Sequence, residues 1–497
     1  MKEKNLSNID AQTIADLNTM NPWWKGNAME QLPKTRRHLV GQIQRRLQYK
    51  LAPIIVVRGS RQIGKTTACL HVIEDLLAAN ISPQQIFRVQ FDDIDALRIA
   101  REPVLQLVRW YEEHILKDTL NNNAAKGQPC YLFFDEIQNL DDWSTQLKFL
   151  VDHSTVQIVV TGSSALRIEQ GRDSLAGRIN TLEVGTLSLT EIGLIRQLAT
   201  TPPPFLPDNG VSILKPKEFW LNLKAYGQQN SLFADAAFKF FSDRGAYPLA
   251  HLRADAPWEL VADQLNETVI KRVIQHDLRL GEKGRKRDAQ LLEELFRLCC
   301  RYAGQAPSIT FLSRDLQQSL SADIGPQRVR TYLKFLSDTL LLRLIQPLEI
   351  RLKKKKSDEK ICLTDHGLRA SWLQEFIPLD AIPADNNEDI TTLSGYIAES
   401  IAGTLFSSIS GLDVSHLPAR DKEPEVDFVL TIGDQRIPVE IKYRNTIKEE
   451  HLRGLKWFIE KPINRAPFGI LVTKNEFNID LDARIVAIPL KHLMLLR

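Results

Sequence analysis

Short apolar runs alternate with amphipathic stretches over the first part of the chain. The runs cover residues 53–60, 85–93, 130–136, 156–164 and 180–188, and helical periodicity is found over 65–79 and 142–152 and in the segment ending at Trp110. Strands that are apolar on both faces are typical of a parallel sheet with helices on each side. The pattern predicts an α/β domain built on a parallel sheet.

The pattern changes after residue 198. Residues 199–250, which include TPPPFLPDNG, are typical of an insertion or linker, and the stretch that follows is helical. Near residue 308 two helices have helix–turn–helix spacing, and strand candidates follow at 342–350 and 360–365. Two helices and a hairpin predict a winged helix. Residues 377–394 are expected to be a second linker.

The last part of the chain predicts a second α/β domain. A helix is expected from residue 394, and strands are expected around 425–430, 436–443, 468–473 and 485–489. The hairpin VDFVLTIGDQRIPVEIKYR lies within this part.

The composition limits the cellular setting and the kinds of partner that we expect for this protein. The 497 residues are 43% hydrophobic and 25% charged, with a net charge of +3, which is ordinary for a soluble protein and permits nucleic acid as a partner. The five cysteines lack C-x-x-C spacing, so a reduced, cytoplasmic setting without zinc is expected. No apolar run approaches membrane-spanning length, and the polar N-terminus does not match a signal peptide.

A phosphate-binding loop is predicted at GSRQIGKT, which matches G-x-x-x-x-G-K-[ST] between a strand and a helix. Loop amides and the helix N-terminus would face the phosphates of ATP, Lys65 would reach the β- and γ-phosphates, and Thr66 would ligate Mg²⁺. The expected nucleotide-binding residues of the loop are Gly59, Ser60, Arg61, Gln62, Ile63, Gly64, Lys65, Thr66 and Thr67.

YLFFDEIQ supplies the acids that such a loop requires. Asp135 at the strand tip is expected to hold the Mg²⁺ shell, and Glu136 to polarise the attacking water. Ser163 ends the next strand and either senses the γ-phosphate or caps the helix that follows, and Ser164 is the alternative sensor.

Together with SLAGRI, SDRGAYP, EVDFVL and VEIKY, these motifs resemble AAA-type ATPases of the additional-strand class. The closer resemblance is to prokaryotic ATP-binding proteins fused to a C-terminal domain of unknown function, and it spans roughly residues 36–475. Ser60 departs from the proline that relatives often have. Arg178 matches an arginine that in related ATPases could serve as a finger or a sensor, or it is a surface arginine. A finger acts on the nucleotide of a neighbouring subunit, which implies a homo-oligomer.

The C-terminal hairpin carries a second candidate chemistry. Glu440 and Lys442 are two residues apart and share a face of their strand, and the hairpin brings Asp427 alongside. Two carboxylates can bind Mg²⁺ or Mn²⁺, and a lysine can orient or activate water. The spacing resembles the PD-(D/E)xK nuclease-like fold, which implies Asp427, Glu440 and Glu399 as metal ligands, with an added ligand from the Ile441 carbonyl, and Lys442 as a catalytic residue.

Basic residues of the winged helix predict nucleic-acid contacts. Arg328 and Arg330 lie on the candidate recognition helix, and four lysines lie at the tip of the wing, Lys353, Lys354, Lys355 and Lys356. Such lysines neutralise phosphates without reading sequence. The alternative is a solvated loop.

The expected order is an N-terminal segment (1–35), a P-loop ATPase domain (36–198), an insertion or linker (199–250), a helical and winged-helix domain (251–376), a linker (377–394) and a nuclease-like domain (395–497). The expected function is ATP hydrolysis that regulates or drives metal-dependent cleavage of nucleic acid, chiefly DNA, in defence against foreign DNA or in repair. The alternatives are an ATP-dependent scaffold with an inactive nuclease-like domain and a DNA-translocating motor.

Overall fold

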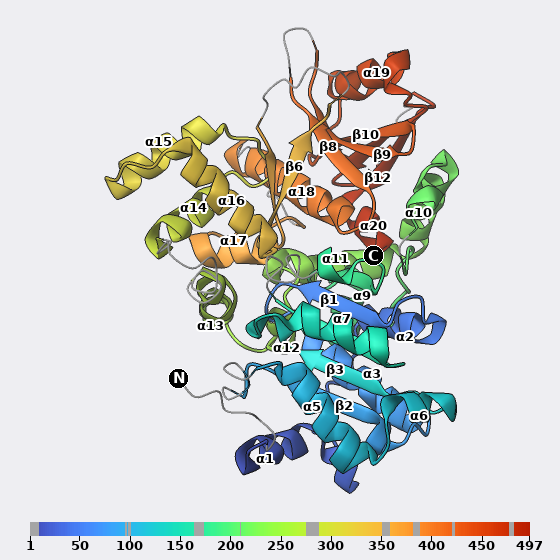
Figure 1. The fold of residues 1–497 in the computed structure, drawn as a ribbon. Coiled ribbons are helices and arrows are strands. Elements are labelled where there is room, and N and C mark those ends of the chain that lie inside the picture. The colour runs from blue at the N-terminus through green and yellow to red at the C-terminus, as the bar shows by residue number, and fades with distance from the viewer. Residues whose placement is uncertain are drawn as a thin grey trace. The chain divides into compact units, whose positions relative to one another are not determined.

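The computed structural model describes residues 9–94, 97, 101–163, 173–208, 210–274, 288–349, 358–380, 388–419, 423–476 and 482–497. The chain divides into two compact units, Met1–Val184 and Gly185–Arg497 (Figure 1). Each unit is built around its own sheet. None of the helices in these ranges is long and apolar enough to cross a membrane.

The N-terminal unit is a five-stranded parallel sheet with the order β2-β3-β4-β1-β5. Strand β4 lies between β1 and β3 in this sheet. The strands are β1 (Ile54–Gly59), β2 (Ile86–Gln90), β3 (Tyr131–Asp135), β4 (Gln157–Gly162) and β5 (Ile179–Val184). The helices are α1 (Ala11–Met20), α2 (His38–Tyr49), α3 (Lys65–Ala78), α5 (Pro103–Tyr111), α6 (Leu120–Ala125) and α7 (Trp143–His153).

Burial on both faces explains why these strands are parallel and apolar. Successive residues of β1, Ile54, Ile55, Val56 and Val57, are all at most 1% exposed although their side chains alternate between faces. The N-terminal segment also belongs to this unit, because the indole nitrogens of Trp23 and Trp24 both donate to the Ile86 carbonyl of β2.

The C-terminal unit contains a seven-stranded mixed sheet with the order β12-β11-β10-β9-β8-β6-β7. The strands are β6 (Leu342–Pro347), β7 (Lys360–Leu363), β8 (Asp413–Leu417), β9 (Val426–Ile432), β10 (Gln435–Lys442), β11 (Gly469–Thr473) and β12 (Ile485–Pro489). The predicted wing strands β6 and β7 are antiparallel, and β6 continues into the C-terminal sheet through two pairs with β8. The middle and C-terminal parts of the chain thus share one sheet.

Helices cover this sheet and extend from its β6–β7 end (Figure 1). They are α9 (Leu189–Ile195), α10 (Lys217–Gln229), α11 (Ser231–Arg244), α12 (Pro248–Leu252), α13 (Trp258–Leu265), α14 (Ala289–Arg301), α15 (Ile309–Leu320), α16 (Pro326–Asp338), α17 (His366–Leu373), α18 (Glu388–Ser407), α19 (Arg453–Glu460) and α20 (Leu490–Leu493). Local chemistry sets their starts: the side chains of Asp288 and Ser308 cap α14 and α15, and Pro326 begins α16.

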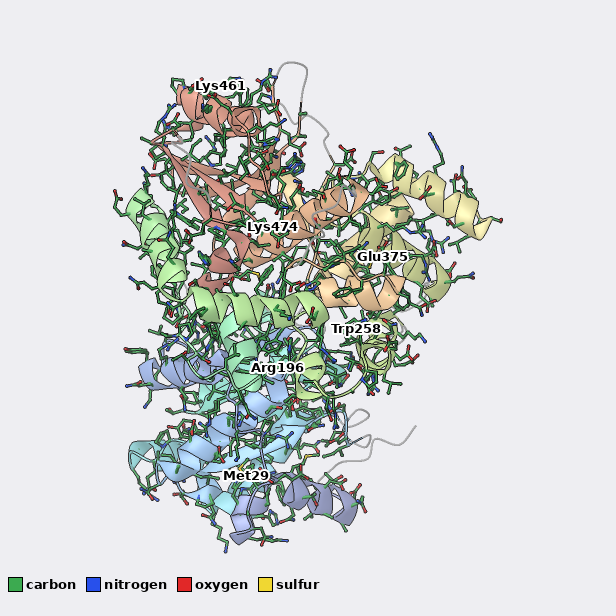
Figure 2. The ribbon with its side chains drawn as sticks, turned by 180° about the vertical axis from the view of Figure 1, so that it is seen from behind. Met29, Arg196, Trp258, Glu375, Lys461 and Lys474 are labelled. Atoms are coloured by element: carbon green, nitrogen blue, oxygen red, sulfur yellow. The ribbon has the colours of Figure 1, made fainter. Side chains whose placement is uncertain are left out.

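Side chains fill the space on both faces of the C-terminal sheet (Figure 2). Phe428 and Leu430 of β9 belong to one buried cluster, whereas Val429 belongs to another together with Leu455 of α19. Residues 199–250, expected as an insertion or linker, include α10, α11 and the start of α12, and Trp220 of α10 is fully buried in the first cluster. This stretch is therefore packed into the core of the unit.

Candidate functional site

The loop between β1 and α3 has the backbone geometry of a phosphate cradle. A Cβ on Gly59 would lie 2.3 Å from Ile63 Cδ1 and 2.7 Å from the Val184 carbonyl oxygen, so only glycine fits there. Gly64 has a φ of 86° and is the N-cap of α3. The two glycines let the loop fold tightly over the start of the helix, where backbone amides favour an anion.

Lys65 lies folded over this loop. Its side chain is 4% exposed, and Nζ donates to the carbonyls of Gly59 at 3.0 Å and Ser60 at 2.9 Å. Nζ is also 4.0 Å from Glu136 Oε1. A bound phosphate would compete with these carbonyls for the ammonium. Lys65 is therefore placed to give up its hydrogen bonds to the loop carbonyls and bind a phosphate instead.

The other predicted loop residues surround this lysine. Ser60 and Ile63 are buried, Gln62 is exposed with a φ of 61°, and Arg61, Thr66 and Thr67 are half-buried, with both threonines in the first turn of α3. Arg37 was not predicted from the sequence, and its guanidinium donates to the Ile63 carbonyl at 2.5 Å. Its position directly before α2, far from the motif in sequence, gave no signal for this contact.

Asp135 ends β3 with its carboxylate held from two sides. The Thr161 hydroxyl donates to Oδ1, and Arg88 Nη2 lies 3.5 Å from Oδ2. Asp135 is 3% exposed. These partners fix the carboxylate at the carboxyl end of the sheet, where ligands of parallel α/β sheets bind.

Glu136 forms a hydrogen-bonded group with the next strand. Ser163 Oγ donates to Glu136 Oε2 at 2.9 Å, and Gln138 Nε2 donates to the same oxygen at 2.5 Å. Ser163 therefore contacts the predicted water-polarising acid, whereas Ser164 and the segment that follows lie outside the described residues.

Asp92, just after β2, is a further acid near this group. Burial, followed by the charges of Glu136, Asp93 and Asp135, raises the pKa of Asp92. The sequence signal was the pair of aspartates at the end of a predicted strand.

Arg178 lies on the surface of the N-terminal unit in an intrachain ion pair. Its Nε is 2.5 Å from Asp152 Oδ1, its Nη2 donates to Asp152 Oδ2 at 3.0 Å, and both side chains are 33% exposed. A role toward a neighbouring subunit would require Arg178 to leave Asp152.

In the C-terminal unit, the hairpin register brings Asp427 and Glu440 together. Phe428 of β9 pairs with Val439 of β10 in an antiparallel ladder, so Asp427 lies opposite Glu440 and on the same face. Asp427 Oδ2 accepts from the Ile441 amide at 2.8 Å, and Lys442 Nζ is 2.5 Å from Glu440 Oε1.

A second lysine, which the sequence analysis missed, lies in this cluster. Lys360 at the start of β7 is 2% exposed, and its Nζ is 2.8 Å from Glu399 Oε2, 3.3 Å from Asp427 Oδ1 and 3.9 Å from Glu425 Oε1. Lys360 thus bridges the acid of α18 and the acid of β9. A lysine that follows a charged stretch of sequence is normally solvated, so the sequence gave only a weak signal, namely the three apolar residues after it.

Burial and mutual charge shift the pKa values of this cluster. Burial and the Asp427 charge raise the pKa of both Glu399 and Glu440. Burial alone would raise the pKa of Asp427, but Lys360 and Lys442 outweigh burial and lower it. The pKa of Lys360 is raised, because its carboxylate partners outweigh the effect of burial. The two lysines therefore favour the ionised form of Asp427, whereas burial and the Asp427 charge disfavour the ionised forms of Glu399 and Glu440.

The donor chemistry of the cluster suits a hard divalent cation. Glu440 Oε2 is buried with no hydrogen-bond partner, and carboxylate oxygens are the ligands that Mg²⁺ and Mn²⁺ prefer. Among the described residues, however, no group of three or more His, Cys, Asp or Glu side chains is arranged to hold a metal ion. Within this cluster the ammonium of Lys360 lies between Glu399 and Asp427.

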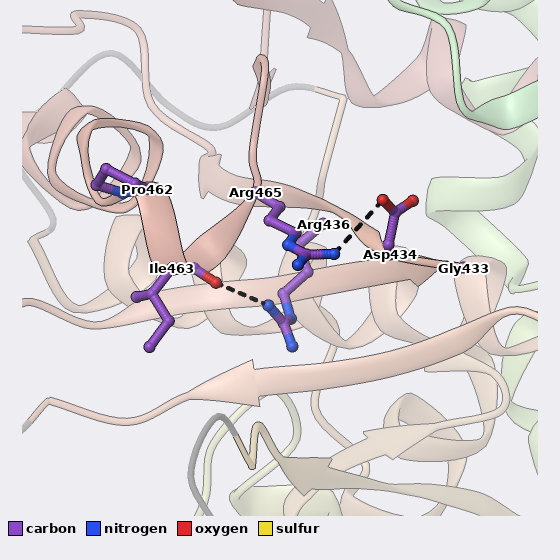
Figure 3. Close-up of a pocket in the computed structure, with 6 residues that line it drawn as sticks. All are labelled: Gly433, Asp434, Arg436, Pro462, Ile463 and Arg465. Atoms are coloured by element: carbon purple, nitrogen blue, oxygen red, sulfur yellow. Dashed lines mark hydrogen bonds and ion pairs between the residues drawn. The ribbon is translucent and has the colours of Figure 1, made fainter.

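A separate pocket of about 410 Å³ lies at the β9–β10 turn, at the far end of the hairpin from Asp427 (Figure 3). Arg465 Nη1 is 3.6 Å from Asp434 Oδ2, and Arg436 Nη1 donates to the Ile463 carbonyl at 3.3 Å. Both arginines of this pocket have partners within the chain.

The predicted nucleic-acid residues are described in part. Arg328 and Arg330 are exposed on α16, and Arg328 Nη2 is 3.7 Å from Asp288 Oδ2. Lys353, Lys354, Lys355 and Lys356 lie outside the described residues.

Comparisons with known proteins support the ATPase chemistry and name no activity for the C-terminal unit. Three family models match: an AAA domain over residues 51–193, a domain of unknown function (DUF8612) over 237–376 and a domain of unknown function (DUF4143) over 394–493.

Several curated relatives are uncharacterised proteins. One from Mycobacterium tuberculosis is 22% identical over 376 residues, which cover 74% of this chain and 66% of that protein, and one from Mycobacterium bovis matches equally. The chain thus spans just under two thirds of these relatives. One from Methanocaldococcus jannaschii is 23% identical over 460 residues, covering 89% of this chain and 85% of that protein.

A similar solved structure is the Walker-type ATPase of Pyrococcus abyssi, with 13% identity and a TM-score of 0.39, covering 69% of this chain and 98% of that one. The family models, together with the loop and acids described above, lead to one conclusion. The chain carries an AAA-type P-loop ATPase domain in its N-terminal part and a DUF4143 domain at its C-terminal part.

Proposed function

We propose that this protein uses its ATPase domain to control metal-dependent cleavage of nucleic acid, with DNA as the expected substrate, at the cluster of Asp427, Glu440 and Lys442. One observation supports the proposed cleavage activity. The two carboxylates and the lysine lie together on one face of a hairpin, and Glu440 Oε2 is buried without a hydrogen-bond partner. A buried carboxylate oxygen without a donor is costly unless a ligand satisfies it.

For the nucleotide site, we assign each residue a role. Lys65 would bind the β- and γ-phosphates of ATP, and Thr66 and Asp135 would hold Mg²⁺, which would supply charge neutralisation there. Glu136 orients and polarises water, and its hydrogen bond from Ser163 sets the direction of its carboxylate. Arg178 would act on the nucleotide of a neighbouring subunit in a homo-oligomer.

In the cleavage half, a divalent cation bound by the carboxylates would neutralise charge on the scissile phosphate. Asp427 and Glu440 would supply oxygens to that cation, and Glu399 and the Ile441 carbonyl would be further donors. Lys442 lies beside Glu440 and orients the attacking water. Its side chain is 22% exposed, so water reaches it.

The helices α14 to α16 and the β6–β7 hairpin would bind nucleic acid as a winged helix. Arg328 and Arg330 are exposed on α16, where they could reach phosphates, and Lys353, Lys354, Lys355 and Lys356 would add contacts that do not depend on sequence. We place the protein in the cytoplasm, in defence against foreign DNA or in repair.

Three proteins test the ATPase half. Wild type should bind and hydrolyse ATP with Mg²⁺, Lys65→Ala should lose nucleotide binding, and Glu136→Gln should bind ATP but turn over 10²- to 10⁴-fold more slowly, as expected for loss of a general base. Equal turnover by all three would refute the assignment.

Plasmid cleavage with Mg²⁺ or Mn²⁺ tests the cleavage half. Wild type should nick or cut the plasmid, and Asp427→Ala should abolish cutting while leaving DNA binding within twofold. Cutting that persists in Asp427→Ala would point to a contaminating nuclease or to another site.

A second candidate function is an ATP-dependent scaffold or signalling switch whose C-terminal domain only binds. The ammonium of Lys360 between Glu399 and Asp427 favours it, because the acids are then already neutralised. This candidate predicts DNA binding without cleavage under every metal condition.

A further inference from the structure

Lys360, 2% exposed, and Lys65, 5% exposed, are the buried lysines among the described residues. Lys65 belongs to the phosphate-binding loop, which explains its burial. Lys360 has no such role in the proposed mechanism. Its partners within 4 Å are the carboxylates of Glu399, Asp427 and Glu425, and it faces the Phe428 ring at 5.0 Å from the centroid. A charge that is buried this deeply needs such compensation.

The backbone fixes Lys360 at this place. The Ile361 amide donates to the Gln305 carbonyl at 2.8 Å, and the Gly304 amide donates to the Ile361 carbonyl at 2.7 Å. Gly304 has a φ of 81°, and a Cβ there would lie 2.1 Å from the Tyr396 carbonyl oxygen. This close approach presses the 304–305 turn and β7 against α18 one turn before Glu399.

The cluster needs positive charge at the point that Lys360 occupies. Lys442 is 2.5 Å from Glu440 Oε1 and leaves Glu440 Oε2 without a partner. Glu399 and Asp427 instead share the Lys360 ammonium. An ammonium and a divalent ion cannot both lie between the same two carboxylates, because they need the same oxygens and repel each other.

We propose that Lys360 is a resident cation that fills the carboxylate cluster in the metal-free chain and must leave Asp427 before a divalent ion binds there. Glu440 Oε2 offers the incoming ion its first ligand. Because Lys360 belongs to β7, the second strand after the α14–α16 helices, metal affinity depends on a residue outside the DUF4143 match. This inference rests on the proposed metal-dependent function.

Mn²⁺ binding tests the inference without any activity assay. The full chain is titrated with Mn²⁺, and unbound Mn²⁺ is measured by electron paramagnetic resonance. Lys360→Met and Lys360→Gln should each bind Mn²⁺ with a Kd about tenfold lower than wild type, since a competing charge worth about 1.4 kcal/mol or more is gone. Asp427→Asn added to Lys360→Met should remove the gain. Lys456→Met, which breaks an exposed 2.8 Å pair with Glu449, should leave the Kd unchanged.

Two outcomes would overturn the inference. Equal or weaker Mn²⁺ binding by both Lys360 variants, with measurable binding by wild type, would overturn it and leave metal-dependent cleavage standing. No Mn²⁺ binding by any of the proteins would overturn both proposals. The glutamine variant retains a hydrogen-bond donor of similar length, so the comparison survives if the methionine variant does not fold.

Discussion

Replacing Lys360 with methionine should destabilise the metal-free C-terminal unit by an amount that depends on pH. The side chain is 2% exposed, so methionine fills a similar apolar volume but supplies no charge. Asp427 then keeps only Lys442 and the Ile441 amide to compensate its charge. Breaking one partner of a buried ion pair typically costs about 3–5 kcal/mol, because the remaining charge is left buried.

Protonation of Asp427 sets an upper bound on this loss. At pH 7, protonating an aspartate of ordinary pKa 3.9 costs about 4 kcal/mol, and at pH 5 it costs about 1.5 kcal/mol. Wild type keeps Asp427 ionised, because its pKa is lowered. A variant that protonates Asp427 on folding binds one proton more than its unfolded chain. Relative to wild type, its free energy of unfolding therefore rises by about 1.4 kcal/mol for each pH unit of acidification.

The loss of unfolding free energy in Lys360→Met can be measured for the C-terminal unit alone by denaturant unfolding in EDTA, followed by hydrogen exchange of peptides from β9 and β10. We expect a loss of about 3–4 kcal/mol at pH 7 that shrinks below about 2 kcal/mol at pH 5. The matched control is Lys456→Met, which breaks a pair of the same 2.8 Å length whose side chains are 31% and 84% exposed. It should cost at most about 1 kcal/mol at either pH. A Lys360→Met loss no larger than that of the control at pH 7 would refute the reasoning.

Three further predictions follow from other parts of the chain. Gly59→Ala should abolish binding of a fluorescent ATP analogue, because the added Cβ would lie 2.7 Å from the Val184 carbonyl oxygen, which backbone pairing holds in place; unchanged affinity would contradict the cradle geometry. Burial lowers the pKa of His251 to about 4. Between pH 6.5 and pH 4 the unfolded chain therefore binds a proton at His251 that the folded chain does not bind, so the free energy of unfolding falls as the pH drops over this range. His251→Gln should lose up to about 3 kcal/mol less over that range, as measured by urea unfolding. Arg330→Ala should weaken DNA binding equally across sequences and reduce the salt slope by about 1, as measured by fluorescence anisotropy; an unchanged slope would remove Arg330 from the interface.

The sequence was sufficient to predict the N-terminal sheet and the local geometry of both candidate sites. Apolar periodicity located all five parallel strands, and the motif GSRQIGKT located a loop whose Gly64 is left-handed as the tight turn requires. Alternation along a strand correctly placed Glu440 beside Lys442, and the antiparallel register placed Asp427 opposite. These inferences succeeded because each depends on residues that are close in sequence or joined by one turn.

Contacts between distant segments were not predictable from one sequence. Lys360 is 39 residues from Glu399 and 67 from Asp427, and their meeting depends on β6 joining the C-terminal sheet through β8. Strand β8 itself was not predicted, because its residues Asp413–Leu417 include Ser415 and His416 and lack a clear apolar pattern. Arg37 likewise reaches the phosphate loop only through the packing of α2 against α3.

The most direct test of the account is the initial rate of DNA cleavage with Mn²⁺, measured with and without ATP for wild type and Lys65→Ala. If the nucleotide site controls the carboxylate site, ATP should change the wild-type rate, and Lys65→Ala should cleave at one rate under both conditions. Cleavage by wild type that is indifferent to ATP, or no cleavage of any nucleic acid tested, would contradict the account.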